Sequence, residues 1–359
     1  MWADIRLRLD PFTVDFAQVV TKVGDVTARA TGQVGVRDNK WQVSIDASSP
    51  RIGRDEVMTF WPTPVGPKTR RWLSKNVVDG DLLKAELGVR AISGQKPDIS
   101  LSFNFEGATI RFLPDMPDIK GAEGRAAITD RAFTIRLDEG YVVAADGGVI
   151  DGSGSVFRVP DTREKPARGE LTLIAEGPLA SALDVLDNPP LELMARAGRP
   201  TDLASATVQA KATVALPLKE GLTKDDVSFE VSGLASEVAS DAIVPGRRLT
   251  SNVLRFRATP EELTISGPGR LDGVPLDADW RLQIGEDENE DADAPQASGR
   301  VVITNDGLNA LGVALPDGLL TGQGEGQYQL YLAEGRPPRL TMYSDLRGLG
   351  LSIPALDWA

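Results

Sequence analysis

The chain contains no cysteine and no histidine among its 359 residues. It therefore cannot form a disulfide, a thiolate nucleophile, an imidazole base or the usual ligand set of a zinc site. A Ser-His-Asp triad is excluded, and catalysis would have to depend on carboxylates, lysine, tyrosine or serine. The absence of cysteine is compatible with a reducing or an oxidising compartment.

Long apolar runs are also absent from the sequence. No stretch approaches the roughly 20 uninterrupted apolar residues that span a bilayer, so we expect this chain alone to cross no membrane. The first residues, MWADIRLRLD, lack the parts of a secretory signal and already alternate like a strand, so we expect the chain to begin inside a fold, as a fragment would. A net charge of −13 argues against a nucleic-acid partner.

Alternation of apolar and polar residues runs through almost the whole sequence. About fifteen segments show it, among them DVTARATGQVGV, KWQVSIDA and RAFTIRLDE. Turn residues separate them at short intervals, at Asp38-Asn39, Asp130-Arg131, Asp146-Gly147-Gly148 and Glu261-Glu262. The pattern predicts a mainly β protein of antiparallel strands.

Three short helices interrupt the strands. Pro67 suits the first position of a helix over KTRRWLSKNVV, with a stop at Asp79-Gly80. Pro178 begins a second helix near 178–187, which Pro189-Pro190 ends. The third follows Asn305 or Asp306 as cap.

Three short helices cannot cover the apolar faces of so many strands. The sheet must therefore close on itself, pack against a second sheet, or leave its apolar face for a ligand. A hydrocarbon ligand needs neither a catalytic group nor directional polar contacts. Any closed β core would use the same apolar positions. The candidate lining residues are Leu83, Ala85, Leu87 and Val89; Leu101, Phe103 and Phe105; Phe133, Ile135 and Leu137; and Ala278, Trp280 and Leu282.

Other motifs favour ordinary structure over chemistry. The acidic run 285–296 lacks the glycine and the final glutamate of a calcium loop and is predicted to be a solvated loop. The glycine-rich pieces near Gly152 and Gly324 lack the context of a phosphate loop. The carboxylate pairs Asp138-Glu139 and Asp225-Asp226 are predicted to lie in solvated turns.

Basic residues cluster once, on the helix that starts at Pro67. Lys68, Arg70, Arg71 and Lys75 lie there beside Trp61 and Trp72. Such a helix could sit at a lipid headgroup surface. The alternative, which we favour from the sequence, is that Trp72 and Leu73 pin the helix to the sheet while the charges face water.

The stretch FWPTPVGPKTRRWLSKNVVDGDLLKAELGVR resembles the signature segment of the YhdP branch of AsmA-like proteins of Gram-negative bacteria. The matching residues are Trp61, Pro62, Trp72, Leu73, Asn76 and Gly80. The likeness continues through most of the chain to the closing LRGLGLSIPAL, and the signature segment is its most specific part.

The resemblance implies a twisted, incompletely closed antiparallel β-sheet whose elongated apolar groove, capped by a few short helices, carries glycerophospholipid between the inner and outer membranes. It implies a periplasmic location, phospholipid as partner, no cofactor, no metal and no enzymatic activity. Family members are anchored in the inner membrane by an N-terminal helix, so the membrane would be reached through parts absent from this chain.

We expect three β units, at residues 1–90, 91–200 and 201–359. The main alternative function is an envelope scaffold that holds partners for outer-membrane integrity and transports nothing. A carboxylate-based glycan hydrolase is disfavoured, because aromatic residues make up only 6% of the chain.

Overall fold

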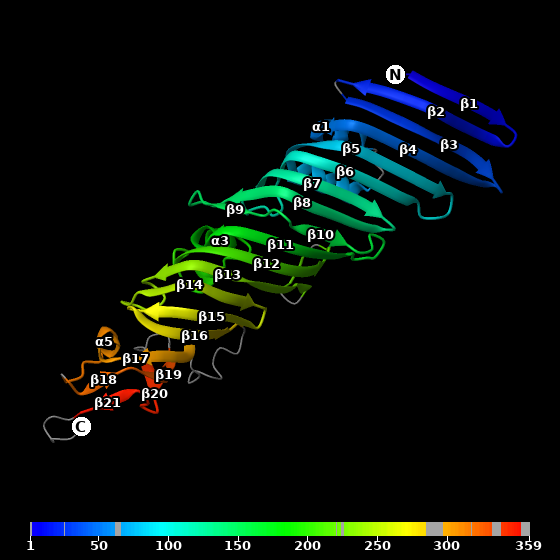
Figure 1. Ribbon diagram of the computed structural model, residues 1–359. Coiled ribbons are helices and arrows are strands. Elements are labelled where there is room, and N and C mark those ends of the chain that lie inside the picture. The colour runs from blue at the N-terminus through cyan, green and yellow to red at the C-terminus, as the bar shows by residue number, and fades with distance from the viewer. Residues whose placement is uncertain are drawn as a thin grey trace. The chain divides into compact units, whose positions relative to one another are not determined.

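The computed structural model describes residues 2–24, 26–61, 66–219, 221–223, 226–284, 297–316, 318–331 and 339–352 (Figure 1). Strands account for 61% of the structure and helices for 11%, so the predicted mainly β class is confirmed. The sheet is antiparallel, is accompanied by five short helices and, within the described residues, is not closed on itself.

The chain divides into two compact units. One consists of Met1–Ile174 and Thr213–Ser228, and the other of Ala175–Ala212 and Phe229–Ala359. These limits differ from the three units expected at residues 1–90, 91–200 and 201–359, which stay a prediction. Strands β11 (Arg168–Pro178) and β12 (Ser205–Pro217) contain residues of both units.

In the first unit, strands β1 to β8 each pair with the next strand in the sequence. The short strands β9 and β10 both pair with β8. Short turns account for most of these adjacent pairs, because two antiparallel strands need only a hairpin between them, whereas helices α1 and α2 join β4 to β5. The bounds are β1 Trp2–Leu9, β2 Phe12–Val23, β3 Val26–Arg37, β4 Lys40–Gly53, β5 Val77–Ile92, β6 Asp98–Ile110, β7 Ile119–Thr129, β8 Ala132–Val143, β9 Val149–Asp151 and β10 Val156–Val159.

The second unit repeats this pattern of neighbouring pairs. Strands β13 to β17 pair in sequence, β17 pairs with β19, and β19 with β20. Strands β18 and β21 form a separate two-stranded sheet. The bounds are β13 Ser228–Ser240, β14 Leu249–Ala258, β15 Glu262–Leu271, β16 Val274–Gln283, β17 Ala297–Ile303, β18 Leu320–Gly322, β19 Gly324–Tyr331, β20 Arg339–Tyr343 and β21 Leu349–Leu351.

Two of the predicted turns have the geometry that tight hairpins require. Asp38 and Asn39 both have positive φ, 51° and 60°, and they join β3 to β4. Asp130 and Arg131 repeat this geometry between β7 and β8, with φ of 49° and 75°. Consecutive positive φ values match the twist of the flanking strands, so both turns are confirmed.

The three predicted helices are present, with corrected ends. Helix α2 (Pro67–Asn76) begins at Pro67 as predicted, but it ends before β5, so Asp79-Gly80 is not its stop. Helix α3 spans Leu179–Leu186. Helix α5 (Asn305–Ala310) is capped by the side chain of Thr304, which accepts a hydrogen bond from the Gly307 amide, so the prediction of Asn305 or Asp306 as cap was wrong.

Two further helices were not predicted. Helix α1 (Arg54–Phe60) directly follows β4, and helix α4 spans only Leu193–Arg196. Neither has a side-chain cap, and the only start signal is the pair of acidic residues Asp55 and Glu56 in the first turn of α1.

Candidate functional site

A row of apolar side chains crosses nine strands of the first unit, with one residue from each of these strands. Cross-strand partners lie on the same face of a sheet, so each pairing extends the row by one strand. We call this the apolar row. Its members, in strand order from β1 to β8 and then β10, are Ala3, Val19, Ala30, Ala47, Leu87, Leu101, Ile128, Phe133 and Val159.

Parallel rows on the same face bring together most of the predicted lining residues. Leu87, Leu101 and Phe133 belong to the apolar row itself. A second row joins Phe103, Ala126, Ile135, Phe157 and Leu171. A third joins Ile52, Leu82, Phe105, Gly124 and Leu137. A fourth joins Ile5, Phe16, Gly32, Ile45, Val89 and Ile99.

Leu83 is the exception among the predicted residues of the first unit. The β5–β6 register shifts between Leu83 and Glu86, and Lys84 there has a φ of 50°. This irregularity pairs Leu83 with Asn104, whereas Leu87 still pairs with Leu101. Leu83 therefore lies on the opposite face, while Ala85, two residues before Leu87, stays on the apolar face.

Exposure on the apolar face varies along the strands. Phe105 is only 6% exposed and forms a core cluster with Ala108 and Ala122, against which Phe103, Ile135 and Leu137 pack. Leu7 and Leu87, by contrast, are 57% and 38% exposed. Part of the face is thus an ordinary core, and part is apolar surface that the described residues leave open to solvent.

The opposite face of the same strands is polar. The row that runs beside the apolar row consists of Arg29, Ser48, Glu86, Ser102, Ala127, Thr134, Arg158 and Glu170. We call this the polar row. Beyond Arg29 the same row continues with the apolar residues Val20 of β2 and Trp2 of β1. From β3 onward the apolar face is thus opposed by a mainly hydrophilic one.

Ion pairs connect neighbouring strands on this polar face. Arg51 binds Asp81, and its Nη1 lies 2.8 Å from Glu106 Oε1. The hydrogen bond that Arg51 donates to the carboxylate of Asp81 raises the pKa of Arg51. Nη2 of Arg90 donates to both carboxylate oxygens of Asp46 at 2.8 Å. Solvent screens such exposed pairs, so each adds little to stability.

A shallow concavity of about 570 Å³ lies over β2 to β7. Its lining combines Leu87, Leu101 and Ile128 with polar residues such as Asp46 and Glu86. The concavity is thus not purely apolar.

The second unit has an equivalent apolar row centred on Trp280. Its members, from β20 to β13, are Leu340, Leu330, Ala297, Trp280, Ile265, Phe256 and Gly233. The neighbouring pairs Ala278–Gly267 and Leu282–Leu263 place the other two predicted residues on this face. Leu282 is exposed, whereas Ala278 and Trp280 are half-buried.

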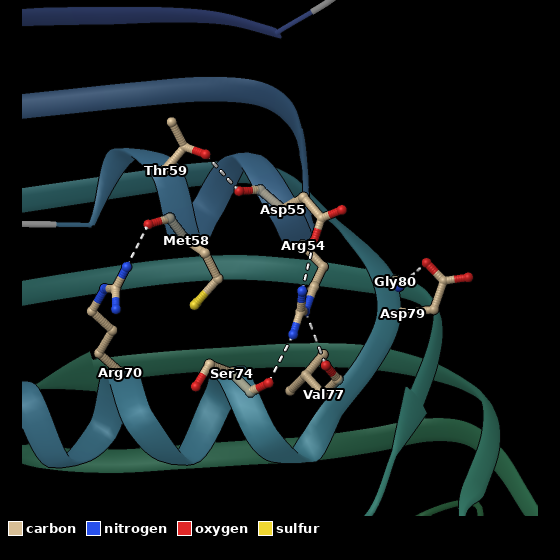
Figure 2. A network of polar contacts seen from close by, with 9 residues as sticks. All are labelled: Arg54, Asp55, Met58, Thr59, Arg70, Ser74, Val77, Asp79 and Gly80. Carbon is tan, nitrogen blue, oxygen red and sulfur yellow. Dashed lines mark hydrogen bonds and ion pairs between the residues drawn. The ribbon is translucent and has the colours of Figure 1, made fainter.

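The signature segment begins at Phe60, the last residue of α1, and forms helix α2, which arginines hold against α1 (Figure 2). Arg54, at the start of α1, donates from Nη2 to the carbonyl of Ser74 at 2.8 Å and from Nε to that of Val77 at 3.1 Å. Arg70 of α2 donates in turn to α1, from its Nη2 to the carbonyl of Met58 at 3.1 Å. We call these contacts the arginine clasp. Both helices also contact β5.

Trp72 does not pin α2 to the sheet, so that prediction was wrong. It is 47% exposed, whereas the adjacent Leu73 is half-buried. The clasp and Leu73 hold the opposite side of the helix, which turns Trp72 outward. Trp61 and Asn76 are half-buried, and Pro62 lies outside the described residues.

Gly80 has a clear physical reason to be glycine. Its φ is +128°, and a Cβ at this position would lie 2.8 Å from the Cα and Cβ of Ala108 on the neighbouring strand. No other residue fits there without moving the strand.

The remaining motifs that the structure describes form turns and strands. The Gly152 segment is a turn in which Asp151 accepts hydrogen bonds from Ser153, and Gly324 begins β19. Asp138 and Glu139 lie within β8 and not in a turn, which corrects the prediction. The acidic run 285–296 and Asp225 lie outside the described residues, among which no group of carboxylates could hold a metal ion.

Comparisons with family models, curated proteins and solved structures gave no match. Among the helices of the described segments, none is long and apolar enough to span a bilayer.

Proposed function

We propose that this chain is a segment of a periplasmic lipid-transfer bridge, in which the apolar sheet face solvates acyl chains while the headgroups remain in water. The observation that carries the proposal is the apolar row, which crosses nine strands without a polar member. The resemblance of the signature segment to YhdP-branch AsmA-like proteins supplies the ligand class, glycerophospholipid. It also supplies the setting, between an inner membrane that anchors the full-length protein and an outer membrane.

The chemistry of the face suits hydrocarbon. An acyl chain needs contact area and the exclusion of water, and it forms no directional bond with the protein. Exposed apolar side chains such as Leu7, Leu87 and Ile99 provide that area. Burying apolar surface stabilises by about 25 cal/mol per Å², so a chain lying along several of them is held without any polar contact.

The test compares one carboxylate on each face of the sheet. Leu87→Asp places a charge in the apolar row at a side chain that is already partly exposed, so the fold should tolerate it. Thr134→Asp places the same charge in the polar row, where Arg158 is its cross-strand neighbour. An unpaired carboxylate among acyl chains costs several kcal/mol, whereas one in water costs little.

Lipid extracted from each purified variant is quantified by mass spectrometry, with circular dichroism as the check on folding. We expect Leu87→Asp to lose bound phospholipid and Thr134→Asp to retain it. The more buried Phe103→Asp, with Ser102→Asp as its neighbour on the polar row, repeats the comparison. Equal retention by folded Leu87→Asp and Thr134→Asp would overturn the proposal, and an unmodified chain that carries no lipid would favour the scaffold.

A further inference from the structure

The outward side of α2 carries three cations around a tryptophan. Lys68, Arg71, Trp72 and Lys75 are all exposed, and they are spaced by three, four and seven residues from the first. At 3.6 residues per turn this spacing places the four side chains on one face of the helix. We call this face the basic stripe.

The basic stripe has no acidic partner among the described residues. The ion pairs found there include none of its three cations. Asp55, the acidic residue at the start of the neighbouring helix, is instead bound by Arg54 at 2.6 Å. Positive charge is thus concentrated on one helix face of a chain whose net charge is −13.

Helix α2 is already formed in the absence of a binding partner. The arginine clasp and the half-buried Leu73 fix α2 from the opposite side, and Figure 2 shows Arg70 and the Ser74 carbonyl directed toward α1. The backbone of the stripe is therefore already helical, so binding does not pay the entropy cost of folding the helix.

We propose that the basic stripe binds the surface of an anionic phospholipid bilayer, a contact separate from the acyl-chain face of the sheet. Three cations complement anionic headgroups, while an exposed tryptophan suits the boundary between headgroup and hydrocarbon. Trp72 is the single apolar residue of the stripe, so the contact is peripheral and mainly electrostatic.

The size of the effect follows from the charge count. Each lysine or arginine near an anionic membrane contributes about 1 kcal/mol, which is roughly fivefold in affinity, so removing all three should weaken binding by about a hundredfold. Reversal of the charges should weaken it further. Binding should also fall as salt rises, because exposed charges are screened.

The experiment measures co-sedimentation of the 359-residue chain with vesicles of phosphatidylcholine alone or of phosphatidylcholine with phosphatidylglycerol. The test variant is Lys68→Glu/Arg71→Glu/Lys75→Glu. The control variant, Lys22→Glu/Lys40→Glu/Lys120→Glu, makes the same change in net charge at three exposed lysines elsewhere. Circular dichroism checks that both variants fold.

We expect binding to the anionic vesicles only, at least a hundredfold weaker for the test variant and little changed for the control. Three outcomes would overturn the proposal: equal binding to both kinds of vesicle, equal losses in the two triple variants, or no vesicle binding at all. The absence of vesicle binding would leave an acidic protein as the partner of the stripe. Because Leu87→Asp acts on the sheet face alone, its vesicle binding should match that of the unmodified chain, which distinguishes this proposal from the lipid-bridge proposal.

Discussion

Replacement of Arg54 by methionine tests whether the arginine clasp holds the helix pair in place. Methionine keeps an apolar stem but removes the donors to the carbonyls of Ser74 and Val77. A hydrogen bond from a charged donor contributes about 1.5–3 kcal/mol. The Arg54 side chain is 29% exposed, and water can replace part of what is lost, so we expect a cost of about 2–4 kcal/mol.

Native-state hydrogen exchange is the appropriate assay, because the helix pair can open without unfolding the whole sheet. A cost of this size should speed exchange of the α2 amides by about 30- to 1,000-fold. Arg71→Met is the matched control, since Arg71 is exposed and lies outside the clasp. Unchanged α2 exchange in Arg54→Met, or the same acceleration in both variants, would refute the clasp as the source of stability.

Two further predictions concern single positions. Gly80→Ala should lower the free energy of unfolding by about 2–5 kcal/mol, because the new Cβ causes backbone strain and overpacking. In the control Gly94→Ala the Cβ meets nothing within 4 Å, so we expect a cost of about 1–2 kcal/mol. Equal shifts of the urea midpoint in the two variants would contradict this. Burial raises the pKa of Tyr328 from 10.0 to about 12, so its contribution to stability is complete below pH 10 and is lost as pH rises through about 12. Ultraviolet titration should show one of the four tyrosines ionising late, and Tyr328→Phe should remove that late step.

Alternation predicted the strands and most of the candidate face, because a period of two is a property of the backbone that sequence shows directly. The prediction from alternation failed at Leu83, because a strand irregularity at Lys84 places Leu83 on the polar face of the sheet. A positive φ at a lysine within an alternating segment leaves no clear mark in a single sequence, unlike one at the Asp and Asn of a turn.

The orientation of α2 was predicted less well, for a different reason. Its limits follow from local signals, above all Pro67, but its buried side depends on Arg54, which belongs to another helix. That helix, α1, has no side-chain cap and only seven residues, so its sequence signal is weak, and the clasp that depends on it was not predicted. The exposure of Trp72 is a consequence of this long-range contact.

Because β1 to β8 pair in sequence order, each strand adds one equal step to the length of the apolar row. Neighbouring strands lie about 4.8 Å apart, so the distance along the row grows by that step with each strand. Position on the row therefore maps directly onto position in the chain. Removing β1, then β2 and then β3 would shorten the row in equal steps. Each remaining strand would still pair with the strand that follows it in the sequence.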